Sequence, residues 1–209
     1  MTITYPLVFP TIGIVQSTWR GRFIIGESES IFTGATQTYK HQGEWWEGEV
    51  TFRPMNHAQA GQVKAFLMSL RGKFGTFLYG DPDYLAKGAN GALGGTPLVD
   101  GIVAARARTL PTKGWTPFTT VLLKGDYIQL GSGATSRLYI VQEDVNTDSA
   151  GYADISIGPG LRVAAANNDA ITVVAPKTVM KMVDNSVEWN SNQSSIVQAV
   201  IAFRESLTI

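Results

Sequence analysis

The chain has 209 residues, 44% of them hydrophobic and only 16% charged, and its 17 basic and 17 acidic residues give a formal net charge of zero. Bulk electrostatic attraction to DNA or to an anionic membrane is therefore not indicated, and specific nucleic-acid binding is not expected. The chain has no cysteine, which excludes disulfides and thiolate chemistry and removes the usual ligands of zinc sites.

The N-terminal segment MTITYPLVFPTIGIV is apolar, but it carries no basic residue and contains two prolines. These features predict an extended arm or a first strand rather than a signal peptide. No apolar run approaches the roughly 20 residues that a membrane helix needs, so no membrane span is expected.

Strands are predicted through most of the first 53 residues. Trp46, Val50 and Phe52 fall on one face of an extended segment, and the charged residues between them fall on the other. This period of two is typical of a half-buried strand. Residues 41–44 (HQGE) contain a glycine and predict a turn, so residues 35–52 are expected to form a β-hairpin.

One helix is predicted, over about residues 56–71. Asn56 is suited to cap its start, with Gln59 three residues later as in a capping box, and Gly72 is a natural stop. A short apolar strand is expected at 74–79. The buried face of the helix is expected to hold Ala60, Val63, Phe66, Leu67 and Leu70.

The composition changes after Pro82 and returns to alternating apolar strands after Pro176. Residues 83–99 are rich in glycine and alanine and predict a linker, whereas residues 100–175 contain short strands separated by turns. We therefore expect a mainly β protein: a split β-barrel or sandwich with one α-helix, plus an inserted small β-barrel-like module. The expected division is a split hub domain at 1–82 and 176–209, a Gly-rich linker at 83–99 and the module at 100–175.

The C-terminal residues 196–207 are predicted to form a long closing strand, with Ala199, Ile201 and Phe203 on its apolar face. A short strand is also predicted at 187–189. We expect the closing strand to join the first sheet, because it would otherwise leave an unpaired apolar edge.

No catalytic, cofactor-binding or metal-binding residues are predicted, and the chain is not expected to be an enzyme. His41 and His57 lie at a turn and a helix start, without a nucleophile or zinc motif beside them. Glu27 and Glu29 share one face of a strand, but an isolated pair of this kind usually faces water. The glycines match no phosphate-binding loop, so no nucleotide cofactor is expected.

Residues 144–148 resemble the start of a calcium loop, because Asp144, Asn146 and Asp148 have the spacing of its first ligands. The match then fails, since Ser149 stands where the loop needs glycine and Ile155 where it needs glutamate. A polar turn whose side chains bind their own backbone is predicted instead.

Trp45 and Trp46 are adjacent, so one ring must face outward if the strand is regular. An exposed tryptophan could stack on a sugar. The favoured interpretation is that the pair contributes to a contact with a neighbouring subunit.

The stretch WEGEVTFRPMNHAQAGQVKAFLMSLRGKFGTFLYGDP resembles tail proteins of long-tailed bacteriophages, and its most specific part is SLRGKFGTFLYGDP. KGDYIQLGSGATSRLYIVQEDVNTDSAGYADISIGPGLR resembles the middle module of the same proteins, and the terminal VEWN and FRESL segments also fit. Within the tail, the resemblance is to the distal tail protein, or tail hub, family.

That resemblance implies a split β-barrel with one helix and an inserted β domain, and it carries over no catalytic residues. It also implies a homo-oligomeric ring, a hexamer in that family, which lies between tail tube and tail tip. The expected partners are further copies of this chain, the tail tube protein and the tail tip protein. The expected location is the tail of the virion, after synthesis in the host cytoplasm.

The leading hypothesis is therefore a structural virion protein that joins the tail tube to the tip. The alternative is a carbohydrate-binding module for host attachment, and a wall hydrolase is a third, less favoured class. A ring that passes DNA should not bind it tightly, so acidic side chains are expected around its bore. The candidates for sugar binding are Trp45, Trp46, Trp115 and Tyr127, and the candidates for the bore are Glu27, Glu29, Glu47 and Glu49.

Overall fold

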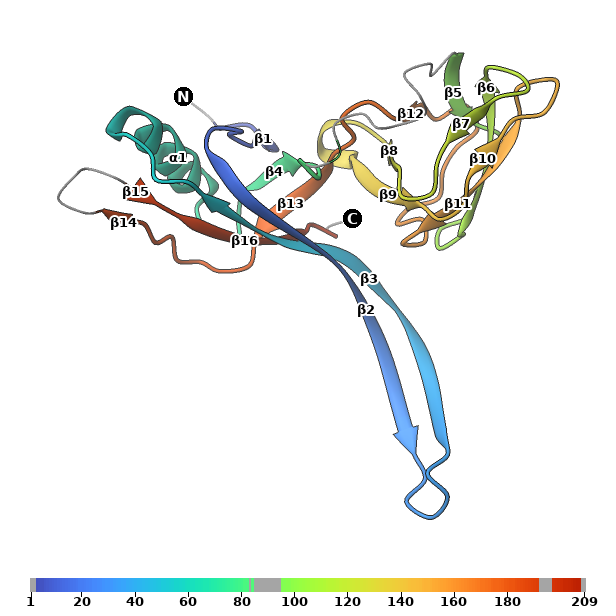
Figure 1. Ribbon diagram of the computed structural model, residues 1–209, viewed down its shortest axis with the longest axis horizontal. Helices are drawn as coiled ribbons and strands as arrows, with labels where there is room; N and C mark the ends of the chain where they lie inside the picture. The colour runs from blue at the N-terminus through green and yellow to red at the C-terminus, as the bar shows by residue number, and fades with distance from the viewer. Residues whose placement is uncertain (1–2, 83, 85–94, 192–196, 208–209) are drawn as a thin grey trace.

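The computed structural model describes residues 3–82, 84, 95–191 and 197–207. The protein is mainly β, and the described residues contain one α-helix, as the sequence predicts. Figure 1 shows two β units side by side and a long two-stranded hairpin that projects away from both.

The first sheet combines strands from both ends of the chain, in the order β1-β4-β13-β16-β3-β2. The closing strand β16 is antiparallel to both of its neighbours, β13 and β3, so it lies inside the sheet and its backbone groups are paired on both sides. The strands of this sheet are β1 (Leu7–Val8), β2 (Ile14–Glu29), β3 (Thr36–Phe52), β4 (Thr76–Tyr79), β13 (Thr178–Met182) and β16 (Val200–Glu205).

The helix α1 spans His57–Leu70 and begins as its sequence dictates. The side chain of Asn56 accepts a hydrogen bond of 2.9 Å from the backbone N–H of Gln59. The helix ends at Arg71, which takes the left-handed conformation one residue before the predicted stop. No helix among the described residues is long and apolar enough to cross a membrane.

The core of the first unit is strongly aromatic. The ring of Phe77 packs against the rings of both Phe9 and Phe203, and all three side chains are buried. Gly48 of β3 lies directly beneath Phe203: a Cβ atom at this position would come within 2.7 Å of the phenylalanine ring and 2.5 Å of the Thr18 carbonyl oxygen. The glycine therefore makes room for the ring of the closing strand.

The second unit is a six-stranded sheet in the order β12-β8-β9-β11-β6-β5. The sheet is nearly closed, because an isolated β-bridge joins Leu98 of its last strand, β5, to Ala170, the residue just before β12. It has its own hydrophobic core, and one of its residues, Leu138, is buried in the core of the first unit instead. A two-stranded pair, β7 with β10, completes the unit. Its strands are β5 (Gly95–Val99), β6 (Thr109–Trp115), β7 (Thr120–Leu122), β8 (Tyr127–Leu130), β9 (Arg137–Val141), β10 (Val145–Asn146), β11 (Ala153–Gly158) and β12 (Ile171–Thr172).

Three boundary predictions are wrong. The end of the expected linker forms strand β5, which pairs with β6 despite its glycine and proline. The strand expected at 74–79 starts at Thr76, and Phe74 before it is exposed. No strand forms at 187–189; the short pair β14 (Asn190–Ser191) and β15 (Val197–Gln198) follows instead, and Ala199 separates β15 from β16. The remainder of the predicted linker, residues 83 and 85–94, lies outside the described residues.

The predicted turn at residues 41–44 is also wrong. Strand β3 runs through this segment, and the chain reverses at residues 30–35, where the N–H of Gly34 bonds to the carbonyl of Ser30. The strand register explains the glycine in this segment. Phe23 of β2 pairs with Glu44 of β3, and Ile25 pairs with Lys40, so one residue of β2 lies opposite three residues of β3. The glycine serves a bulge rather than a turn.

Candidate functional site

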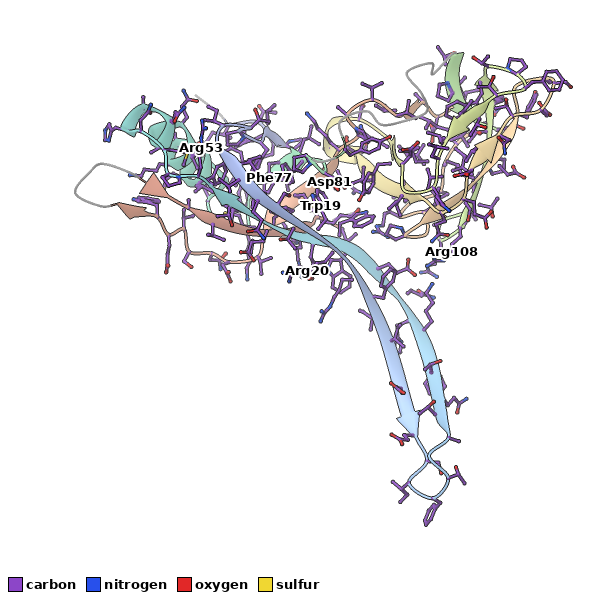
Figure 2. The ribbon with its side chains drawn as sticks, in the orientation of Figure 1. Trp19, Arg20, Arg53, Phe77, Asp81 and Arg108 are labelled. Atoms are coloured by element: carbon purple, nitrogen blue, oxygen red, sulfur yellow. The ribbon has the colours of Figure 1, made fainter. Side chains whose placement is uncertain are left out.

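The hairpin formed by β2 and β3 is the most unusual surface of the molecule. We call its outer part, residues 23–40, the arm. Figure 2 shows the side chains along it, which stand clear of both units up to its tip. Ile31 and Phe32 at the tip are 90% and 91% exposed, and Phe23, Ile25 and Tyr39 further down are about half exposed or more. Large apolar side chains gathered on a projecting element mark a contact surface for another molecule.

The acidic bore candidates lie on the β2–β3 hairpin, but they do not form one wall. Glu27 and Glu29 are opposite Thr38 and Thr36 on the arm, while Glu47 and Glu49 lie nearer the sheet. The two-residue period places Glu27 and Glu29 on the face that Lys40, Glu44 and Trp46 share, and it places Glu47 and Glu49 on the opposite face. The four carboxylates therefore cannot all face one bore.

The two tryptophans have different surroundings. Trp46 is buried with 7% exposure, and its indole Nε1–H donates a hydrogen bond of 2.9 Å to the carbonyl of Leu138 in the second unit. Trp45 is half-buried on the other face, where its Nε1–H donates to Glu47 at 2.7 Å. Only Trp45 is placed to meet a neighbouring subunit, because Trp46 is already covered within its own chain.

The helix residues Val63, Leu67 and Leu70 are buried in the first core, and Phe66 is half-buried against the same core. Their face covers the sheet. They hold the first unit together and do not form a surface site.

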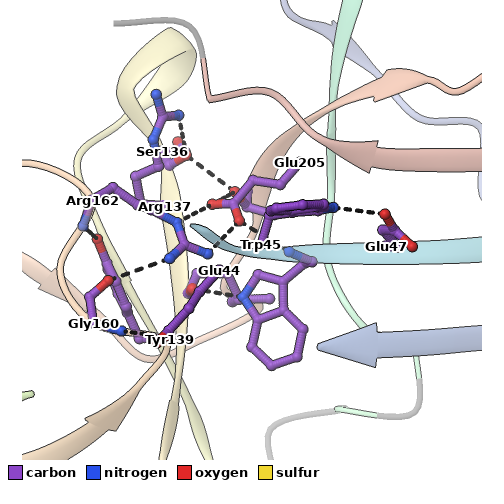
Figure 3. A network of polar contacts seen from close by, with 12 residues as sticks. Glu44, Trp45, Glu47, Ser136, Arg137, Tyr139, Gly160, Arg162 and Glu205 are labelled. Atoms are coloured by element: carbon purple, nitrogen blue, oxygen red, sulfur yellow. Dashed lines mark hydrogen bonds and ion pairs between the residues drawn. The ribbon is translucent and has the colours of Figure 1, made fainter. Parts of the chain in front are cut away.

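A network of polar contacts joins the two units, and we call it the junction (Figure 3). On one side of it Glu44 of β3 is only 8% exposed. Its carboxylate accepts hydrogen bonds from Arg108 of the second unit and from the N–H of Gly160 at 3.2 Å, and it forms an ion pair with Lys40 at 2.7 Å. Figure 2 shows Arg108 at the edge of the second unit nearest the hairpin.

These contacts decide the charge of Glu44. Burial by itself raises the pKa of its carboxyl group, because it removes water from the charged form. The hydrogen bond from Lys40, the Gly160 amide and the charge of Arg108 together outweigh burial, and the pKa lies below its ordinary value. The carboxylate is thus kept ionised by groups from both units.

The other side of the junction is a second carboxylate, Glu205 of β16, which is 1% exposed. The Arg162 guanidinium donates two hydrogen bonds to it, at 2.6 and 3.3 Å, in the paired geometry that suits arginine. The backbone N–H of Trp46 donates a third at 3.1 Å. The Arg162 backbone N–H in turn donates to the hydroxyl of Tyr139. The pKa of the Tyr139 hydroxyl is raised, mainly by burial, so the phenol stays neutral.

An aromatic contact extends the junction. Tyr127 of the second unit packs edge-on against Trp46 and against Tyr84, and its hydroxyl lies 3.4 Å from a carboxylate oxygen of Asp81. Burial, with the charge of Asp81 second, raises the pKa of Tyr127 to about 12. Tyr127 therefore has a structural place at the junction and is half-buried there.

The junction borders two hollows. The first, of about 370 Å³, is lined by five cationic side chains and the carboxylate of Glu44. The second, of about 710 Å³, lies in the second unit and is lined largely by apolar and small residues such as Leu130, Ala134 and Ala164. Arg137 and Val163 line both, so the basic hollow and the apolar groove are neighbours. The cationic residues of the first are Lys40, Arg106, Arg108, Arg137 and Arg162.

The remaining candidates do not form a binding site. Trp115 is 4% exposed and donates its indole N–H to Thr112, so its ring is not available to stack on a sugar. Asp148 accepts hydrogen bonds from the backbone N–H groups of Ala150 and Tyr152, and these bonds lower its pKa. Asp148 therefore binds its own turn as predicted, but Asp144 accepts from the backbone N–H of Lys124 at 2.9 Å and Asn146 lies in β10, so the predicted turn is confirmed at Asp148 alone. The described residues contain no cluster of three or more metal-ligating side chains.

Sequence reasoning missed the arm and the junction. The arm was hidden because FII and IF look like core segments of ordinary strands. The junction was hidden because its partners are distant in sequence: Glu44 and Arg108 are 64 residues apart. The available signal was the unusual density of arginine at 106, 108, 137 and 162 in a chain with few charges.

A comparison with models of protein families finds none that matches this chain, and a comparison with curated protein sequences finds no match either.

Proposed function

We propose that this chain is a structural protein of a long-tailed bacteriophage tail, a ring-forming hub of the distal tail protein kind that joins the tail tube to the tail tip. The observation that carries the proposal is the arm. Ile31 and Phe32 are almost fully exposed at the tip of a hairpin that projects from the protein. A surface of this kind is suited to self-assembly, because another molecule must cover it.

The order of the structural units supports the same function. Strands from both ends of the chain share one sheet with the helix, and strands from the middle form a second, barrel-like unit. This is the arrangement that the resemblance to tail hub proteins implies. The neutral net charge agrees with it too, since long-range repulsion between copies would be small.

The proposed assembly is a homo-oligomeric ring in the virion tail, with the tail tube protein on one face and the tail tip protein on the other. The subunits are made in the host cytoplasm. Because the four carboxylates lie on two faces of the hairpin, we assign the bore to Glu47 and Glu49 alone. The carbohydrate-binding alternative loses two of its four candidate residues, because Trp46 and Trp115 are buried.

The test is the mass and shape of the purified protein. Sedimentation velocity should give particles several-fold heavier than the 22.6 kDa chain, and negative-stain microscopy should show closed rings. Mixed with tubes of its phage's tail tube protein, the rings should collect at tube ends. A monomer at every concentration, with specific binding to host glycans, would instead support the attachment module.

A further inference from the structure

The arm has an ordered chemical pattern. Between Phe23 and Tyr39 its only charged residues are Glu27 and Glu29, which lie on one face, and the exposed apolar tip follows directly. The two carboxylates are separated by two strand positions, about 7 Å. Beyond the exposed apolar residues Phe23 and Ile25 at its root, the arm therefore presents negative charge and then an apolar end.

The junction has the complementary order. Its basic hollow is lined by five cationic side chains, whereas two carboxylates, Glu44 and the Glu205 that binds Arg162, pair with them, so an excess of positive charge remains in a protein that is neutral overall. Arg106 is exposed in it, and Arg137 is half-buried. The apolar groove begins where Arg137 and Val163 end the basic hollow, and Val163 is 55% exposed at this boundary.

The arm of the same molecule does not fill these hollows. Residues 40–44, where the arm joins the rest of β3, line the basic hollow, and the tip of the arm points away from the second unit. The arm of another copy matches both hollows in charge and in apolar character. We propose that the arm of one copy docks on the junction of a second copy, with Glu27 and Glu29 over the basic hollow and Ile31 and Phe32 in the apolar groove.

This contact is head-to-tail, because the arm and the junction are different surfaces of the same chain. A contact of this type closes into a ring when its rotation permits, and it otherwise forms an open filament. The inference rests on the proposed function in one respect: it supplies the subunit contact that a ring needs. It adds that the second unit takes part in assembly.

The test uses two full-length variants, each defective in one surface. The arm variant carries Glu29→Arg and Phe32→Asp, and the junction variant carries Arg106→Glu and Val163→Asp. All four positions are exposed, so circular dichroism and the melting temperature should match those of the unaltered chain. A control variant carries Ile102→Asp, which is 85% exposed on the second unit but lines neither hollow.

Sedimentation velocity should show each defective variant as a monomer, with self-association weakened at least about 100-fold. The control should assemble like the unaltered chain. An equimolar mixture of the two variants should form a dimer and stop there, because it contains one intact arm and one intact junction per pair. A second readout is a disulfide between Phe32→Cys of one copy and Ala134→Cys of another, which is specific because the chain has no native cysteine.

The outcomes separate this inference from the proposed function. If the unaltered chain forms rings and both variants still do, the contact lies elsewhere and the inference is overturned, while the hub function stands. If the variants are monomeric but their mixture is too, the arm and junction do not meet, and the inference is likewise wrong. A chain that is monomeric at every concentration would sink both.

Discussion

At the scale of single residues, the two units meet at two buried carboxylates of the first unit, Glu44 and Glu205. Arg108 and Arg162 of the second unit bind them. Glu205 and Arg162 are 0% and 10% exposed in their side chains, whereas Lys40 and Arg108 around Glu44 are 54% and 38% exposed. Removing one partner of a fully buried pair leaves an uncompensated charge, but a partly exposed pair is screened by water. The two halves of the junction should therefore respond differently to mutation.

Arg162→Ala should lower the free energy of unfolding by about 3 kcal/mol, because it strands the Glu205 carboxylate in the interior. Urea unfolding followed by fluorescence measures this change. Arg106→Ala is the matched control: it removes an arginine from the same hollow at an exposed position, and it should cost less than about 0.5 kcal/mol. Equal effects of the two changes would show that Arg162 does not neutralise a buried charge.

Glu44→Gln tests the pH dependence of the junction. The folded pKa of Glu44 lies below its ordinary value of 4.5, so the ionised group stabilises the folded chain above that value, and this contribution is lost as the pH falls through the folded pKa. The unaltered chain should exceed the variant in stability by up to about 1 kcal/mol near pH 7, since its partners are partly exposed. The difference should shrink on acidification.

The control for this measurement is Glu143→Gln, which removes the same charge from an exposed position that lies outside the arm and both hollows. A difference between Glu44→Gln and the unaltered chain that stays constant down to acid pH would contradict the ion-pair explanation. It would then reflect packing alone.

At the scale of elements, the helix and the arm show how local each signal is. The helix could be predicted because Asn56, its capping bond and the periodic apolar face all lie within 15 residues of sequence. The arm could not, because the apolar residues of β2 look the same whether a core covers them or another molecule does. The glycine at position 43 misled for a related reason: it serves a bulge whose existence depends on the register with β2.

Leu67→Asp tests the helix at this scale. Leu67 is 1% exposed in the first core, so a carboxylate there should lower the free energy of unfolding by about 4 kcal/mol or prevent folding. Met68→Asp is the control, because the neighbouring side chain is 62% exposed and should tolerate the charge. Thermal melts of the two variants in parallel give the comparison. Similar melting temperatures would mean that this face of α1 does not support the sheet.

At the scale of the whole molecule, each unit has its own sheet, and the two units meet where Leu138, Tyr127 and Ile140 of the second unit pack into the core of the first. Within the part of the chain that the structure describes, no strand of the second unit pairs in the first sheet, whose closing strand β16 lies between β13 and β3. The sequence predicted this division from its composition change. It did not predict that the second unit covers Trp46, because this contact depends on how the two finished units meet.

Replacing residues 86–174 with a short Gly/Ser linker should leave a folded first unit, since its six strands and helix are all retained. Its stability should fall by at least about 3 kcal/mol, because Trp46 loses the Leu138 carbonyl and Glu205 loses Arg162. The tryptophan emission should shift to longer wavelength as Trp46 meets water, and the same deletion combined with Trp46→Phe should lack most of that shift.

The shortened protein should also sediment as a monomer, because the apolar groove that receives the arm is gone. A shortened chain that folds and still forms rings would show that the first unit alone carries assembly, and an unfolded one would show that the two units depend on each other for stability.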